Sequence, residues 1–269
     1  MLTNKSIRFI SCLSFSIMSI CRPLGVSGQQ PAKFTMQRAT ILLDSTTYDN
    51  ASKTAVMQKI AHYHSLLSEE MEVVIGRSSE IQVSFEPASP LSNLLTDLLF
   101  DYGNRYMKIY HGLQADLSLL NFGGIRNVLP EGDITVGDIY KIAPFENYAV
   151  IIGLKGSELK KALNRFTDKK NQPFSQLKVV YLDGIPREIT INGNLIEDDK
   201  VYYLVTLDFI QNGGDGILKG IKYTDIVETG ELFRDVLIEE IKQMAAEGQT
   251  ITPRRDDRVM ITPHIKKPQ

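Results

Sequence analysis

Three short loops in this sequence combine glycine or proline with residues that can contact a ligand. The first loop, residues 121–126, reads Asn-Phe-Gly-Gly-Ile-Arg. Its adjacent glycines, Gly123 and Gly124, allow the backbone to turn sharply and to approach a ligand, because no Cβ intervenes. Asn121 offers a donor and acceptors, and Arg126 offers a planar fork of donors suited to a carboxylate, a phosphate or a ring edge. The alternative is an ordinary glycine turn with a surface arginine.

The second and third loops supply two aromatic rings and a carboxylate. Phe145 follows a proline in the second loop, and the third loop, residues 209–216, begins with Phe209 and contains Asp215. The third loop also contains Asn212 and Gly214. Two phenylalanines on loops could clamp a flat ring by offset stacking, and the carboxylate could accept hydrogen bonds from ribose hydroxyls. The structural alternatives are core packing for both rings and turn formation for Asp215.

No self-contained catalytic or metal-binding motif is recognisable in the sequence. His62 and His64 lie two residues apart in a predicted helix, so their side chains point about 200° apart and cannot share one metal ion. The sequence contains no H-E-x-x-H motif, no phosphate-binding P-loop and no G-x-S-x-G nucleophile motif. The G-x-G-x-x-G dinucleotide motif is also absent. We therefore expect no metal and no catalytic residue set in this chain alone.

The overall composition is that of an ordinary globular protein. The chain has 269 residues, of which 43% are hydrophobic and 23% are charged. Lysine and arginine number 30 against 32 aspartates and glutamates, which gives a formal net charge of −2. This balance argues against a global basic surface for nucleic acid.

The first residues have the pattern of a secretory signal peptide, which we assign to residues 1–28. Lys5 and Arg8 precede an apolar run of 13 residues, residues 9–21, which is too short to span a bilayer. Small residues follow, so we expect the mature chain to begin near Gln29. The sequence thus predicts export to a periplasm or to the outside of the cell, the alternative being an unprocessed cytoplasmic N-terminus.

Both cysteines of the chain, Cys12 and Cys21, lie in this predicted signal peptide. The mature chain would therefore contain no disulfide, no thiolate nucleophile and no cysteine-ligated zinc. Cys21 leaves a lipoprotein anchor open. However, Ile20 is a poor residue before a lipidated cysteine, so we favour soluble export.

Hydrophobic spacing predicts both helices and strands, although it does not give the order of the strands. We expect an α+β fold, in which a mixed β-sheet packs with helices in two layers, as one domain over residues 29–269. Ser89 and Pro90 mark the start of a strong helix that we expect Gly103 to end, and Thr135 begins a capping box with Asp138. The predicted helices are residues 50–71, 90–102, 136–142, 157–166 and 233–244. The predicted strands are residues 34–43, 73–76, 115–120, 149–154, 177–182, 187–191, 201–207 and 258–261, with a hairpin turn at residues 192–193.

Taken together, the loops resemble the C-terminal domain of the 5′-nucleotidase family. Their order and approximate spacing both match, over residues 89–261, which is more specific than any single loop. The segments that carry the resemblance are residues 121–126, 132–135, 144–145, 154–159 and 212–216. In that family, this domain holds the nucleoside part of the substrate.

The resemblance implies a role for each loop residue. Phe145 and Phe209 would sandwich the base, and Asn121 would contact the base. Arg126 would contact the ribose or the phosphate, and Asp215 would bind the ribose hydroxyls. The remaining members of the substrate-binding set would be Gly123, Gly124, Asn212 and Gly214.

The sequence departs from the family in two ways. Full-length members carry an N-terminal metallophosphatase domain with a two-metal site, and its Asp-x-His, Gly-Asn-His-Asp/Glu and Gly-His-x-His motifs are missing here. Residues 89–94 read Ser-Pro-Leu-Ser-Asn-Leu, in which serine replaces the usual glycine, and no arginine stands just upstream. One arginine that clamps the substrate in the family therefore has no counterpart at this position.

Two functions compete on this basis. The first is the substrate-binding part of a 5′-nucleotidase-type phosphohydrolase in nucleotide catabolism, with hydrolysis supplied by a separate metallophosphatase chain that holds divalent metals such as Zn or Mn. The second is an exported, non-catalytic nucleoside-binding, nucleotide-binding or assembly module. An apolar patch near Arg126 would favour docking of a partner, whereas a polar face there would favour a stand-alone binder.

Overall fold

The computed structural model describes residues 55–262. The predicted signal peptide and the predicted strand at residues 34–43 lie outside the described residues. The described part belongs to a compact unit that begins at Ala55, and the domain boundary near residue 29 stays a prediction. Within residues 55–262, no helix is long and apolar enough to cross a membrane.

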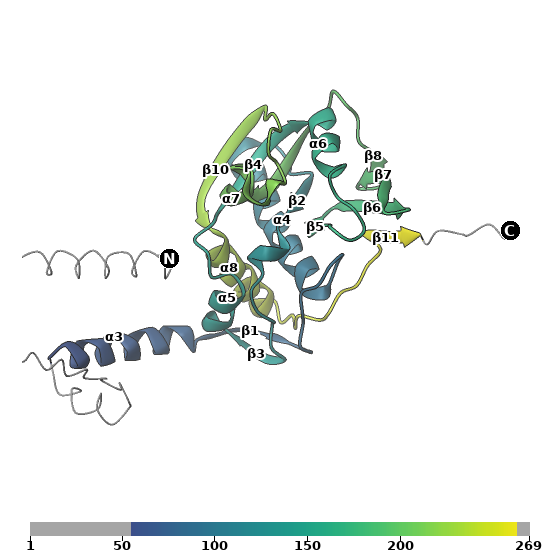
Figure 1. Cartoon of the computed structure of the whole chain (residues 1–269). Coiled ribbons are helices and arrows are strands. Elements are labelled where there is room, and N and C mark those ends of the chain that lie inside the picture. Colours follow the sequence, from purple (N-terminus) through teal and green to yellow (C-terminus); the bar gives the residue numbers. More distant parts are fainter. Residues whose placement is uncertain (1–54, 263–269) are drawn as a thin grey trace, which may run out of the picture. The chain divides into compact units, whose positions relative to one another are not determined.

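A five-stranded sheet forms the centre of this unit (Figure 1). Its strands are, in spatial order, β10 (Asp225–Leu232), β4 (Tyr148–Lys155), β9 (Val201–Leu207), β2 (Leu117–Leu119) and β5 (Phe174–Ser175). Strand β4 pairs antiparallel with β10 and with β9, whereas β9 pairs parallel with β2. The sheet is therefore mixed, as predicted. Its strand β4 is apolar and buried through its interior, which explains why its sequence does not alternate.

Two helices, α4 (Pro90–His111) and α8 (Phe233–Ala246), pack against each other and against this sheet. The apolar stripe of α4 places Leu91, Leu95 and Leu99 in the core, where each is at most 1% exposed. A sheet covered by a layer of helices is the arrangement expected from the spacing of apolar residues. The α+β fold class predicted from the sequence is confirmed.

The remaining strands form two smaller sheets. One contains β11 (Val259–Thr262), β6 (Leu177–Leu182), β7 (Ile185–Ile191) and β8 (Asn194–Leu195), and the other pairs β1 (Val74–Ser78) with β3 (Gly132–Thr135). The turn between β7 and β8 has positive φ at both Asn192 (50°) and Gly193 (79°). This is the primed hairpin turn that the Asn-Gly sequence predicts.

Four further α-helices belong to the described residues: α3 (Ala55–Met71), α5 (Val136–Ile142), α6 (Gly156–Leu163) and α7 (Asp208–Gln211). The predicted capping box of α5 is confirmed. The backbone N–H of Asp138 donates to the Thr135 hydroxyl at 3.2 Å, and the backbone N–H of Thr135 donates to the Asp138 carboxylate at 3.1 Å.

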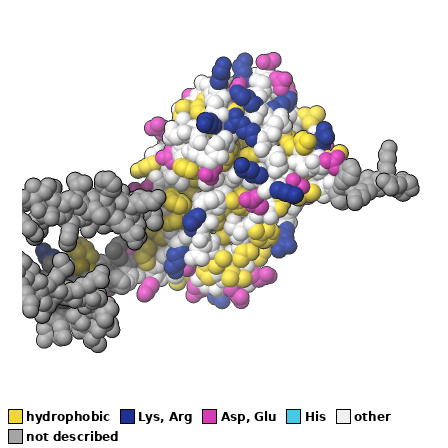
Figure 2. Space-filling view, in the orientation of Figure 1, with side chains coloured by type: hydrophobic (Ala, Val, Ile, Leu, Met, Phe, Trp, Pro, Cys, Tyr) yellow, Lys and Arg dark blue, Asp and Glu magenta, His cyan; other side chains and the backbone are white. Residues whose placement is uncertain are grey.

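On the face shown in Figure 2, basic and acidic side chains are interspersed and form no continuous basic surface.

The prediction that Gly103 ends α4 is wrong. The helix continues to His111 and is capped by Gly112, whose φ is 66°. Gly103 instead lies where α4 presses on β9, because a Cβ at this position would stand 2.5 Å from both Cγ atoms of Val205. A glycine that allows close packing and a glycine that stops a helix look the same in a local sequence window.

Replacing Gly103 with alanine is expected to destabilise the protein, although the same change in an exposed helix adds about 1 kcal/mol of stability. The added methyl group overpacks the contact with Val205, which costs about 1–3 kcal/mol. Urea unfolding of Gly103→Ala measures this loss. In a Val205→Ala background the same substitution should become neutral or stabilising, and a gain of stability in the wild-type background would contradict this packing role.

Candidate functional site

The first loop forms a short 3-10 turn, η1 (Phe122–Gly124), shortly after β2. Asn121, which precedes the turn, is buried, and its side-chain Nδ2 donates a 2.7 Å hydrogen bond to Oδ2 of Asp215. The backbone N–H of Phe122 donates to the side chain of Gln172 at 3.0 Å. The Asn121–Asp215 bond joins the first and third loops across 94 positions of sequence.

The glycines of the first loop leave room for Asn121. A Cβ at Gly124 would stand 2.8 Å from Asn121 Oδ1, whereas a Cβ at Gly123 would make ordinary contacts. Within the described part of the chain, Asn121 Oδ1 is buried and accepts no hydrogen bond. Because buried acceptors are normally satisfied, this oxygen is available to a hydrogen-bond donor from a ligand or a water molecule.

Arg126 stands exposed beyond the glycine turn. Its backbone N–H donates to the carbonyl of Ile142 at the end of α5, and Nη1 makes a 3.4 Å contact with the carbonyl of Gly123. Among residues 55–262, no carboxylate forms an ion pair with Arg126. Its guanidinium can therefore bind an anionic ligand group without breaking an existing ion pair.

Phe209 of the third loop lies on α7, which follows β9. Its side chain is 42% exposed, and a Cβ at Gly214 would stand 2.5 Å from the Cζ of its ring, so the ring packs closely over the glycine backbone. Asp208 Oδ1 accepts the backbone N–H groups of Tyr148, at 3.0 Å, and of Phe209, at 2.7 Å, which ties α7 to the start of β4.

The far end of α7 is held by Tyr223. Its hydroxyl donates a 2.7 Å hydrogen bond to the carbonyl of Gln211. Burial raises the pKa of the Tyr223 hydroxyl, so this donor stays protonated across the physiological range. The α7 segment, which carries Phe209, is thus fixed at both ends.

Asp215 occupies an unusual backbone conformation in the turn η2 (Gly214–Gly216). Its φ is 53° and its ψ is 8°, which is the left-handed region that residues other than glycine seldom adopt. The residue is exposed, and its carboxylate accepts the Asn121 amide. Backbone strain of this kind occurs preferentially at functional sites.

Phe145 of the second loop is 47% exposed, so the structure excludes core packing for both Phe145 and Phe209. Phe145 lines a small hollow together with Asn121 and Gly124 of the first loop. A second hollow has a volume of about 470 Å³ and is lined by Phe209 and its neighbour Asp208. The other residues that line it are Asn147, Asn212, Gly213 and Gly214.

Asn147 lines both hollows and therefore connects the second loop to the first and third. The sequence analysis did not select it. The available signal was a polar residue two positions after Phe145, at the entry to a buried strand. The structure thus brings all three predicted loops to one region of the surface and adds Asn147 to their lining.

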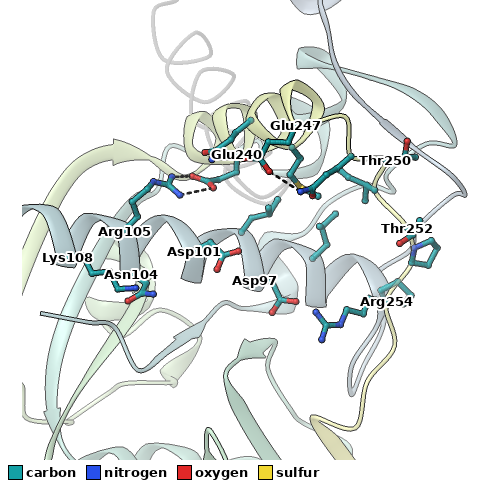
Figure 3. Close-up of a pocket in the computed structure, with 18 of the residues that line it drawn as sticks. Asp97, Asp101, Asn104, Arg105, Lys108, Glu240, Glu247, Thr250, Thr252 and Arg254 are labelled. Carbon is teal, nitrogen blue, oxygen red and sulfur yellow. Dashed lines mark hydrogen bonds and ion pairs between the residues drawn. The ribbon is translucent and has the colours of Figure 1, made fainter.

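A larger hollow lies elsewhere, between α4 and α8, and has a volume of about 860 Å³ (Figure 3). None of the nine predicted site residues lines it. Two of its acidic groups already have partners. Glu240 forms an ion pair with Arg105. Asp97 accepts a hydrogen bond from Ser175 and forms an ion pair with Arg258. We therefore place the candidate site at the three loops rather than at this larger hollow.

Several carboxylates around the large hollow repel one another, and metal ligands do not gather there or elsewhere in the described residues. Burial raises the pKa of Asp101, and the nearby carboxylates of Asp97 and Glu240 raise it further. Within residues 55–262, no three His, Cys, Asp or Glu side chains are arranged to hold a metal ion.

Exposed apolar side chains lie beside the first loop. Gln82 and Leu129 exchange two backbone hydrogen bonds of 2.9 Å, which brings the segment containing Ile81 and Val83 next to Val128. These three side chains are 59%, 41% and 37% exposed, respectively. Val128 is two residues beyond Arg126, so these apolar side chains lie close to the end of the first loop.

Comparisons with known proteins show which family the chain belongs to. Protein UshA of Yersinia enterocolitica is 35% identical over 134 residues, which are 48% of this chain and 24% of that protein. The 5′-nucleotidase-related protein of the fly Glossina morsitans morsitans is 25% identical over 256 residues, which are 84% of this chain and 44% of that protein. The chain thus spans less than half the length of either relative.

The fold is shared with a solved structure. The 5′-nucleotidase precursor from Thermus thermophilus superposes with a TM-score of 0.63 at 24% sequence identity, over 77% of this chain and 43% of that one. The family described as "5'-nucleotidase, C-terminal domain" matches residues 70–222, which is more than half of the chain and includes all three loops. The protein belongs to the 5′-nucleotidase C-terminal domain family.

Proposed function

We propose that this protein is the nucleoside-recognising part of a 5′-nucleotidase-type phosphohydrolase that acts in nucleotide catabolism. The observation that carries the proposal is the hydrogen bond between Asn121 and Asp215, which unites two distant loops beside two half-exposed phenylalanines. The names of two similar proteins, 5′-nucleotidase-related protein and 5′-nucleotidase precursor, support the same substrate class.

In this proposal the three loops together recognise the base and the ribose of the ligand. The rings of Phe145 and Phe209 stack on the two faces of the base, and the exposed Asp215 carboxylate accepts hydrogen bonds from the ribose hydroxyls. The free acceptor of Asn121 takes a donor from the ligand. Gly123, Gly124, Asn212 and Gly214 shape the backbone around them.

Hydrolysis would come from a metallophosphatase that this chain docks against. Divalent metals such as Zn or Mn in that partner would activate water and stabilise charge on the phosphoryl oxygens. The exposed apolar surface of Ile81, Val83 and Val128 beside the site supports docking over a stand-alone role. A partner on a separate chain needs such an interface, because no covalent tether raises its effective concentration.

A non-catalytic nucleoside-binding or assembly module is the second candidate. The same loops would then bind a nucleoside with no chemical step, in the periplasm or outside the cell. The pattern of residues 1–28 supports export for either candidate. A phosphate-release assay with AMP separates the two candidates. Release by a mixture of this chain and its metal-loaded partner, with none from either chain alone, would favour the phosphohydrolase.

The substitution Arg126→Ala tests whether Arg126 contacts the phosphate group of the ligand. The substitution is expected to weaken AMP binding about tenfold while leaving adenosine binding nearly unchanged, because one charge-assisted hydrogen bond contributes about 1.5–3 kcal/mol. Calorimetric titration of both ligands measures the difference. Arg187→Ala, which removes an exposed arginine outside the three loops, is the matched control. Equal losses for both ligands would contradict a phosphate contact at Arg126.

A further inference from the structure

The loop that carries Asp215 is held from outside by Arg165, which follows α6. Arg165 Nη1 donates to the carbonyls of Gly216 and Ile217, each at 3.0 Å, and Nη2 donates to the carbonyl of Lys219 at 2.7 Å. A single guanidinium thus binds three carbonyls within four residues of backbone. Only the planar fork of arginine presents donors in this arrangement.

Two side chains of α6 hold the backbone segment that follows these three carbonyls. Lys161 Nζ donates to the carbonyl of Gly220 at 3.0 Å, and the Glu158 carboxylate accepts the backbone N–H of Lys222 at 3.1 Å. That N–H, together with Lys161, lowers the pKa of Glu158, so the acceptor stays ionised near neutral pH. We call Glu158, Lys161 and Arg165 the α6 brace.

The backbone beside this brace has an uncommon conformation. Gly213 and Gly216 have φ values of 91° and 72°, which glycine adopts freely, but Asp215 between them has a φ of 53°. Aspartate adopts this conformation more readily than most residues with a Cβ, but an extended conformation still competes with it. The structure supplies two restraints that favour the observed conformation: Arg165 on the loop carbonyls directly after Asp215, and the Asn121 amide on its carboxylate.

We propose that Arg165 is a positioning residue that keeps the Asp215 carboxylate in place for ribose recognition. The inference rests on the proposed function, because it takes a nucleoside as the ligand. Without the guanidinium, the three carbonyls turn toward water and Asp215 relaxes to a negative φ. Its carboxylate then leaves the Asn121 amide and the ribose position, whereas Phe145 and Phe209 keep their places.

The effect should therefore depend on the ribose of the ligand. Calorimetry with adenosine and with free adenine, which lacks the ribose, separates loss of positioning from general damage. Arg165→Ala is expected to weaken adenosine binding about tenfold and to leave adenine binding unchanged. Loss of the hydrogen bonds from the charged guanidinium is enough to shift the loop equilibrium by at least about that factor. Arg165→Lys should fall between, and Arg187→Ala should match the wild type.

Equal weakening of adenine and adenosine in Arg165→Ala, or no weakening of either, would overturn the proposal. Circular dichroism melting of each variant verifies that it is folded. Failure of the proposed function looks different, because the wild-type protein would then bind no nucleoside at all. In that case the side-chain amide resonance of Asn121 reports on Asp215 without a ligand: a shift in Arg165→Ala supports the positioning role, and an unchanged resonance excludes it.

Discussion

Alanine substitution of both Phe145 and Phe209 is expected to weaken adenosine binding at least about 100-fold. Stacking of one base on one aromatic side chain contributes about 1–3 kcal/mol, and 1.4 kcal/mol corresponds to a factor of ten. Each single substitution should therefore cost about tenfold. The two rings come from different loops but line hollows that share Asn147. We therefore expect both rings to contact one ligand.

The loss in this double variant should appear in binding and hardly in folding. Both rings are nearly half exposed, at 47% and 42%, so their removal leaves no large cavity in the core. Tyr110→Ala removes a more exposed ring, 68% exposed on α4, and serves as the control outside the three loops. Wild-type affinity in the double variant, or an equal loss in Tyr110→Ala, would rule out the aromatic clamp.

Gly156→Ala is expected to destabilise the fold by about 3 kcal/mol or more, at the upper end for overpacking. A Cβ at Gly156 would overlap the carbonyl oxygen of Glu197 and would also stand 2.9 Å from Cγ2 of Ile196. The carbonyl belongs to the backbone and cannot rotate away as a side chain would. The same segment is fixed because the Gly156 N–H donates to the carbonyl of Lys200 at 2.8 Å.

Urea unfolding of Gly156→Ala, compared with Gly123→Ala, measures this cost. A Cβ at Gly123 makes only ordinary contacts, so that variant should keep nearly wild-type stability. Because α6 begins at Gly156 and leads to Arg165, partial unfolding here should also weaken adenosine binding. A wild-type urea midpoint for Gly156→Ala would show that the contact with Glu197 relaxes without cost.

Local patterns in the sequence predicted the elements whose residues carry their own signal. The stripe of leucines in α4, the buried run of β4 and the capping box of α5 all reflect neighbours within a few positions. Strand β10 was missed, because it is mostly exposed, contains Gly230 and carries Glu228 and Glu231 in place of a clear apolar alternation. Its pairing with β4 is set by tertiary context rather than by propensity.

The candidate site was likewise predicted only in part, because some of its features depend on local sequence and others on tertiary contacts. Glycine pairs, loop aromatics and Asp215 were visible as residue types, but their exposure was not, and core packing was the competing interpretation of both rings. The bond between Asn121 and Asp215 needs the fold, because parallel pairing of β2 with β9 brings the ends of these strands together. Arg165 gave no signal at all, since its partners are backbone carbonyls that any sequence would supply.

The most direct test of nucleoside recognition is calorimetric titration of adenosine into the wild-type chain and into Asp215→Asn. Asparagine tolerates the left-handed backbone conformation, so this variant removes the charge and keeps the loop. We predict saturable binding of one adenosine per wild-type chain and a loss of at least about tenfold in the variant, because hydrogen bonds to a charged group contribute about 1.5–3 kcal/mol. No binding by the wild type, or equal affinity in both proteins, would contradict nucleoside recognition at these loops.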